Sequence, residues 1–267
     1  MSTGPKLTED DFRRHRQYLP DDAFAYIKGK YAPATSPMPK RQWNSLMNLP
    51  DDVLLRTTDH QGGQLAQLHN LWGMWVELLP LDTKEALFIR SAGWDAADDF
   101  NAASFMAAHG YYRQAMASLR SALEQLTIAA AFAARNDEAK LGRWLAGQGQ
   151  PPKFGNARDN LRPTLGSVVT EVLNDLQRVL SGYHHAQAST ANAAIWQSNG
   201  PVWTPEAFTA FYRAFRDTMA MCLVMLCIGW PEFQIPGKCR ELFKSPGGMW
   251  NEVETSVIDR WLLERIL

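Results

Sequence analysis

The chain has 267 residues, enough for one large domain or for a domain with a substantial extension. Hydrophobic residues make up 46% and charged residues 21%, which is typical of a soluble globular protein able to bury a core. The formal net charge of -1 excludes a basic field over the whole surface, so any contact with nucleic acid must come from a local patch.

The N-terminus and the cysteines favour a cytoplasmic protein. No hydrophobic core of a signal peptide follows the polar Met-Ser-Thr-Gly-Pro-Lys start. The longest apolar run, residues 218–230, is shorter than the roughly 20 residues that span a membrane. Cys222 and Cys227 lie in this run without metal-ligand spacing, and with Cys239 they make an odd number, so we expect Cys222 and Cys227 to be small buried hydrophobic residues.

Residues 1–83 are predicted to form an N-terminal extension that is partly helical. Prolines punctuate the first 50 residues, which predicts a loosely structured arm with a short helix or two, one near residues 21–30. Hydrophobic residues at helical spacing from Leu68 to Leu79 predict a helix that Pro80 ends. Asp82-Thr83 then predicts the N-cap of the next helix.

Residues 84–267 are predicted to form a helical bundle that begins with two helices. The first covers residues 84–108 and ends at His109-Gly110, where glycine takes its usual place after a helix. The second covers residues 111–134. Its apolar stripe has the spacing of a helix packed nearly parallel to another, and it consists of Tyr112, Met116, Leu119, Leu123, Leu126 and Ala130.

Two more helices and a C-terminal one complete the predicted bundle. The third covers residues 167–196, with one face formed by Val169, Val172, Leu176, Val179 and Tyr183. In the fourth, Thr204 is the N-cap and Pro205 the first helical residue, and the stripe is Phe208, Phe211, Phe215, Met219, Cys222 and Leu226. A last helix is predicted over residues 251–266. No run alternates like a strand, so the predicted fold is an all-α, antiparallel four- to five-helix bundle.

The most informative motif lies near the end of the third predicted helix, in Arg178-Val-Leu-Ser-Gly-Tyr-His184-His185. If the helix continues through it, Arg178 and His185 share a face, about 10 Å apart along the axis. RNA carries its own nucleophile, the ribose 2′-hydroxyl, so cleavage needs only a base and a cation on the phosphate. Histidine suits the first role and arginine the second, without a metal or another cofactor. A structural role, with a surface arginine and a capping histidine, is the alternative.

The chain resembles the HEPN superfamily (higher eukaryotes and prokaryotes nucleotide-binding domains) over about residues 84–230. The resemblance rests on Tyr112-Arg-Gln-Ala-Met-Ala-Ser-Leu-Arg-Ser-Ala-Leu-Glu, on Leu180-Ser-Gly-Tyr-His-His, and on the turn Trp196-Gln-Ser-Asn-Gly-Pro before a long apolar helix. It implies a metal-independent endoribonuclease that works as a homodimer, often in a toxin–antitoxin or antiphage role. A protein antitoxin or regulatory partner is then expected, whereas DNA is not.

Carried over to this chain, the resemblance implies Arg178 and His185 as catalytic residues, with His184 as the alternative histidine. It also implies a supporting role for Arg120 and Glu124, which otherwise form an ordinary i,i+4 surface pair. Val179 stands where active members usually carry a polar residue. This departure favours the alternative function, a non-catalytic helical module that binds RNA, nucleotide or a protein partner.

Basic and aromatic residues elsewhere add candidate RNA contacts. A connection rich in Gly and Pro, residues 147–155, carries Lys153, with Arg158 and Arg162 just beyond, and we take these three as RNA-binding candidates. Trp144, next to Arg143, and Trp196 are of a type that stacks on bases. A group of acidic residues is interpreted as a solvated helix face and not as a metal site: Asp95, Asp98 and Asp99.

Overall fold

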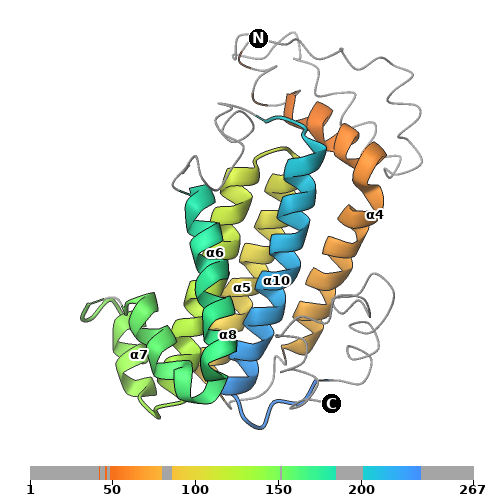
Figure 1. The fold of residues 1–267 in the computed structure, drawn as a ribbon. Helices are drawn as coiled ribbons and strands as arrows, with labels where there is room; N and C mark the ends of the chain where they lie inside the picture. The colour runs from red at the N-terminus through yellow and green to blue at the C-terminus, as the bar shows by residue number, and fades with distance from the viewer. Residues whose placement is uncertain are drawn as a thin grey trace.

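The computed structural model describes residues 49–79, 86–150, 152–184 and 201–235, together with Gln42 and Leu46. Within these ranges most residues are helical and none is in a strand, which confirms the predicted all-α bundle (Figure 1). The helices are α4 (Leu49–Leu78), α5 (Leu87–Ala108), α6 (Tyr112–Ala133), α7 (Glu138–Leu145), α8 (Phe154–His184) and α10 (Pro205–Gly229).

Helix α6 is at the centre and packs against α5, α8 and α10 (Figure 1). At one end of the bundle the backbone N–H of Val202, just before α10, donates to the carbonyl of Gly110 at 3.5 Å, between α5 and α6. At the other end Gly229 of α10 lies against Ile89 of α5 and Ala130 of α6. Helix α6 is therefore antiparallel to α5 and parallel to α10, and α8 comes between α6 and α10 in the chain.

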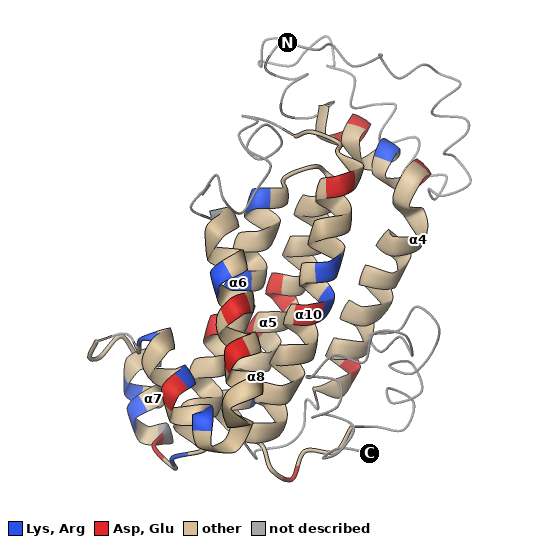
Figure 2. Cartoon of the chain, in the orientation of Figure 1, with Lys and Arg blue, Asp and Glu red and all other residues tan. Residues whose placement is uncertain are grey.

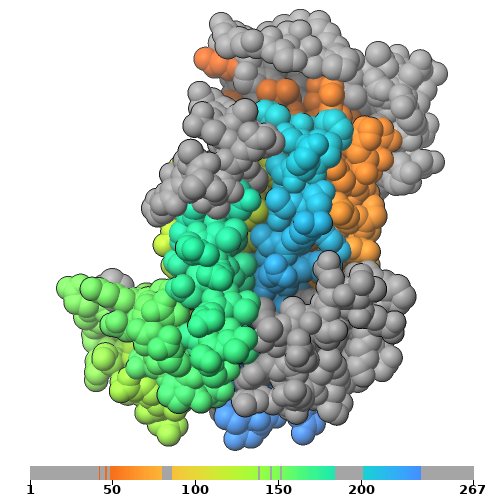
Figure 3. Space-filling model, viewed as in Figure 1, coloured from red at the N-terminus to blue at the C-terminus, as the bar shows by residue number. Residues whose placement is uncertain are grey.

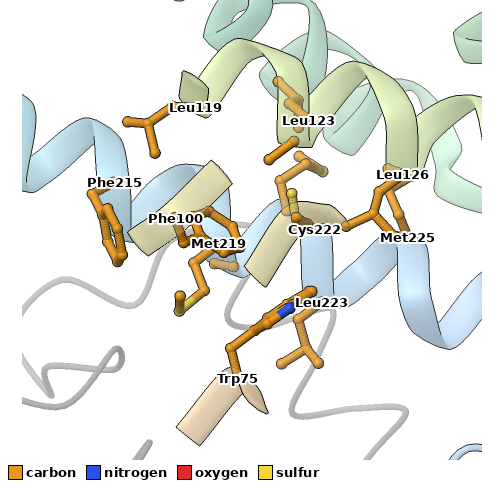
Figure 4. Packing of buried hydrophobic residues seen from close by; sticks show 14 of the residues in the cluster. Trp75, Phe100, Leu119, Leu123, Leu126, Phe215, Met219, Cys222, Leu223 and Met225 are labelled. Carbon is orange, nitrogen blue, oxygen red and sulfur yellow. The ribbon is translucent and has the colours of Figure 1, made fainter. Parts of the chain in front are cut away.

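The apolar stripes of α6 and α10 form the core, as their spacing predicted. Every residue of both stripes is buried. Figure 4 shows Leu119, Leu123 and Leu126 facing Met219 and Cys222 across the interior. Aromatic rings of three helices continue this layer, because Phe100 packs on Trp75 and on Phe215 with centroid distances of 5.3 and 5.2 Å. The helical period alone therefore identified the buried faces of these two helices.

Helix α4 is longer than predicted and packs onto the same core. It begins at Leu49 and contains a break at Gln61, where φ is -128° and ψ is 23°. Its C-terminal part is the predicted helix and ends at Leu78, before Pro80. The indole N–H of Trp75 donates to the carbonyl of Gly93 at 2.9 Å, and that of Trp72 donates to Ala97 at 3.0 Å. These bonds join the predicted N-terminal extension to α5.

Helix α8 consists of two helical parts that fold back at Gly166, which has φ 76° and ψ 165°. The guanidinium of Arg158 donates to the Oδ1 of Asn174 at 2.6 Å. In a straight helix these residues would be about 24 Å apart along the axis, so the bond requires the fold-back. The predicted start at Ser167 is confirmed, whereas the first part of α8 and the whole of α7 were not predicted.

The predicted buried face of the second part of α8 was wrong at one position. Val179 is exposed, and the buried hydrophobic residues of this part are Val169, Leu173, Leu176 and Leu180. The true face therefore runs through Leu173 and Leu180 rather than through Val179. The predicted helices near residues 21–30 and 251–266, the N-cap at Asp82-Thr83, Trp196 and Cys239 lie outside the described residues.

Candidate functional site

The rotation of α8 about its own axis is set by a polar link to α6 as well as by its buried leucines. The Nε2 of Gln177 donates to the Oε1 of Glu124 at 3.0 Å, and the same oxygen accepts from the Nε of Arg120 at 2.7 Å. All three side chains are partly buried between the helices. Arg120 and Glu124 therefore lie against the helix that carries the motif. Their contact there is with Gln177, the residue before Arg178, and not with Arg178 itself.

Because Gln177 faces α6, the next residue, Arg178, points outward. Its side chain is 74% exposed, and its guanidinium donates to Asp175 at 3.0 Å, one turn earlier. Surface pairs at this spacing contribute only a few tenths of a kcal/mol. A phosphate that approaches α8 can therefore displace Asp175 from the guanidinium.

The rest of the motif lies at the end of α8, with its inner side against the core. Leu180 and Gly182 are buried, and Tyr183 packs on the core, where burial raises the pKa of its phenol. Tyr183 therefore has the packing role expected for it. His184 is the last helical residue, described by its backbone, and His185 lies outside the described residues.

The three predicted RNA contacts on the connection and on α8 differ in their surroundings. Lys153 and Arg162 are exposed. Arg158 is partly exposed and is held at the surface by its own neighbours, since it donates to Asp159 at 2.9 and 3.0 Å as well as to Asn174. These bonds use its Nε, Nη1 and Nη2 atoms, so this geometry favours a role for Arg158 in closing the fold-back of α8.

A cavity of about 730 Å³, which the sequence did not predict, lies between the end of α6, α7 and the start of α8. Figure 2 shows Lys and Arg gathered around α7, beside this cavity. Its lining includes two aromatic side chains, Phe132 and Trp144. It also includes four cationic side chains and two acidic ones: Arg135, Lys140, Arg143, Lys153, Asp137 and Asp159. In a chain with a net charge of -1, this is a local concentration of positive charge.

The walls of the cavity are held in place from several sides. The guanidinium of Arg135 at the end of α6 donates to the Oδ1 of Asn160 on α8 at 2.8 Å. Leu141 of α7 is buried, and Gly142 lies so close to Phe88 that an added Cβ would be 3.0 Å from the ring. These contacts tie α7 to α5 and the end of α6 to α8, on two sides of the cavity.

One of the three carboxylates interpreted as a solvated face is not solvated. Asp95 and Asp98 are exposed, as predicted, but Asp99 is half-buried, and its Oδ2 has no hydrogen-bond partner among the described residues. Burial is the main cause that raises the pKa of Asp99, the Ser121 hydroxyl lowers it, and the two neighbouring carboxylates raise it further. The prediction failed at Asp99 because α6 and α10 pack over that side of α5.

The predicted burial of Cys222 is confirmed, and Cys227 is half-buried. Burial raises the pKa of Cys227 to about 12, so its thiol is protonated at neutral pH. In the ranges covered by the structure, no three His, Cys, Asp or Glu side chains are grouped to hold a metal ion. No helix within these ranges is long and apolar enough to cross a membrane.

Comparison with known proteins adds no further assignment. No protein-family model, curated protein or solved structure matches this chain.

Proposed function

We propose that this protein is a metal-independent endoribonuclease that contacts RNA through the outward face of α8. Arg178 would hold the scissile phosphate, and His185 would remove or supply a proton, with His184 as the alternative. The observation that carries the proposal is the exposed guanidinium of Arg178, displayed on a helix whose rotation is fixed by Gln177 and the buried leucines. Helix α8 itself lies beside α10 (Figure 3).

The chemistry follows from the two residue types. The planar, permanently charged guanidinium gives two parallel hydrogen bonds to a phosphate and offsets the charge that develops as the 2′-oxygen attacks. A histidine with a pKa near 6.5 is partly neutral at pH 7 and can take the 2′-hydroxyl proton. The product of this attack is a 2′,3′-cyclic phosphate with a free 5′-hydroxyl on the other fragment.

A homodimer would supply what one chain lacks. An isolated, exposed Arg178 does not enclose a substrate, and one histidine cannot act as base and acid at the same moment. Two copies related by a two-fold axis would bring two such pairs to one cleft. The role in toxin–antitoxin or antiphage systems follows from the HEPN resemblance and belongs to the same proposal.

The second candidate function is a helical module that binds RNA without cleaving it. Val179 favours this function, because it is 38% exposed beside Arg178 and presents a methyl surface where a polar group would help to orient a phosphate. Binding needs the exposed arginine only, whereas cleavage needs the histidine as well.

The test is incubation of the purified full chain with a mixed RNA pool in EDTA. The variants are Arg178→Ala, His185→Ala, and the matched control Arg213→Ala, which removes an exposed arginine on α10. We expect the wild type and Arg213→Ala to leave 2′,3′-cyclic phosphate ends, and the other two variants to leave the RNA intact. Asp175→Asn should increase RNA affinity, because it removes the carboxylate that competes for Arg178.

The binding module is the correct function if the wild type retains RNA without cleaving it and Arg178→Ala weakens that retention. Wild-type protein that neither binds nor cleaves RNA would refute both functions. Circular dichroism of each variant separates these results from loss of the fold.

A further inference from the structure

We infer that the cavity between α6, α7 and the start of α8 is a binding site for a free nucleoside phosphate, separate from the α8 face that carries Arg178. The inference goes beyond the proposed function, since it needs neither Arg178 nor a histidine. The inference is based on the volume of this cavity, on its positively charged side chains and on its aromatic side chains.

The size and the chemical lining point to this class of ligand. A cavity of about 730 Å³ lies within the usual range of roughly 300–1,000 Å³ for small-molecule sites. Its polar lining combines the cations with side-chain amides that can pair with a base or a ribose, namely Gln148, Gln150, Asn156 and Asn160. Trp144 provides an aromatic surface on which a base can stack.

Three of the four cations of the cavity are exposed to a ligand. Lys140, Arg143 and Lys153 have no ion pair with any residue in the part of the chain that the structure describes. Lys140 lies over the ring of Phe132, 5.9 Å from its centroid, which keeps the ammonium at the wall of the cavity. Arg143 and Lys153 are exposed. A phosphate can therefore bind without first breaking an internal salt bridge.

The first turn of α8 adds to the attraction of an anion. Lys153 precedes the helix, and its carbonyl accepts the hydrogen bond from the N–H of Ala157 at 3.1 Å. The N–H groups of Phe154, Gly155 and Asn156, which come before this bond, have no acceptor within the helix, and the positive end of the helix dipole lies there. Asn156 lines the cavity, so a phosphate bound near Lys153 lies within reach of this helix end.

Helix α7 holds the aromatic and cationic sides of the site in one arrangement. Trp144 is partly buried and packs on the core, which restricts its ring, and Arg143 is the next residue before it. Because Leu141 is buried and Gly142 abuts Phe88, α7 cannot rotate without disturbing α5. The ring of Trp144 and the guanidinium of Arg143 therefore line the same cavity from one helix.

The experiment is calorimetric titration of the full chain with ADP, adenosine and inorganic phosphate. The variants are Arg143→Ala, Lys153→Ala and Trp144→Leu, and the matched control is Arg213→Ala, an exposed arginine on α10 outside the cavity. We expect ADP to bind more tightly than adenosine or phosphate. Each cation variant should raise the Kd for ADP about ten-fold or more, because a charge-assisted hydrogen bond is lost.

Trp144→Leu should raise the Kd for ADP while leaving that for phosphate unchanged. Arg213→Ala and Arg178→Ala should leave ADP binding as in the wild type. The inference is overturned if ADP does not bind at millimolar concentration, or if Arg143→Ala and Lys153→Ala bind it like the wild type. Equal affinity for phosphate and ADP would also overturn it, since the ring would then contribute nothing. Failure of the ribonuclease proposal would appear in the RNA assay and leave these titrations unaffected.

Discussion

Replacing Gly110 by alanine should destabilise the bundle more than the same change at Gly147, although both glycines end a helix in the same way. Each has a positive φ, 80° at Gly110 and 76° at Gly147. After α5 the N–H of Gly110 donates to the carbonyl of Ala107, and after α7 the N–H of Gly147 donates to that of Trp144. In both cases the N–H of the next residue donates to the carbonyl five residues before it, from Tyr111 to Met106 and from Gln148 to Arg143. Both are therefore Schellman motifs.

The two positions differ in what surrounds the added methyl group. A Cβ on Gly110 would lie 2.6 Å from the carbonyl oxygen and 2.7 Å from the nitrogen of Val202. A Cβ on Gly147 would meet no atom of the described residues within 4 Å. Positive φ costs a non-glycine residue roughly 1–2 kcal/mol at both positions. At Gly110 the backbone of residue 202 must also move, which breaks its bond to Gly110 and strains the adjacent contact of Tyr112 with Thr204.

Two hydrogen bonds at about 1 kcal/mol each add about 2 kcal/mol to the cost at Gly110. We therefore expect the free energy of unfolding of Gly110→Ala to lie about 2 kcal/mol below that of Gly147→Ala. For a domain of this size the difference corresponds to a Tm lower by roughly 4–8 °C. Urea denaturation and thermal melting followed by circular dichroism measure both quantities. Equal stability of the two variants would refute the close approach of residue 202 to the turn.

Two further predictions concern the core and the response to alkali. Leu123→Ala should lower the free energy of unfolding by about 2–5 kcal/mol, because Leu123 is fully buried, while the exposed Val168→Ala should change it by no more than about 0.5 kcal/mol. Similar losses in urea denaturation would contradict the assignment of the core. Burial raises the pKa of Tyr112 to about 12, above its unfolded value of 10.0, so its neutral phenol stabilises the fold fully below pH 10 and loses this effect as the pH rises to 12. Tyr112→Phe should show a smaller loss of stability across that pH range, and an unchanged loss would show that Tyr112 does not titrate there.

The fold was predictable where the signals are local. Pro205 after Thr204 marks the start of α10, and Gly110 marks the end of α5, because both act through the backbone of their own turn. The stripes of α6 and α10 are buried in full because a 3.6-residue period defines one face whatever the partner helix is.

The site was predictable only as a motif. The sequence located Arg178 on a helix and placed Arg120 and Glu124 on another. It did not show that Gln177 takes the inward position, because residues 176–180 contain apolar side chains on both sides of the helix. The choice is made by contacts with α6, where Leu173, Leu176 and Leu180 are buried and Glu124 accepts the bond from Gln177.

By itself, the sequence determined that α5, α6, α10, the second part of α8 and the end of α4 are helical, and which faces of α6 and α10 are buried. Both results depend on neighbouring residues and on a short period. The tertiary structure decided the fold-back of α8 and the cavity beside α7. The fold-back is closed by the bond from Arg158 to Asn174, and the cavity gathers side chains spread over residues 131–160 from three helices. A chain with almost balanced charge shows no basic patch along its length, and only packing brings these cations together.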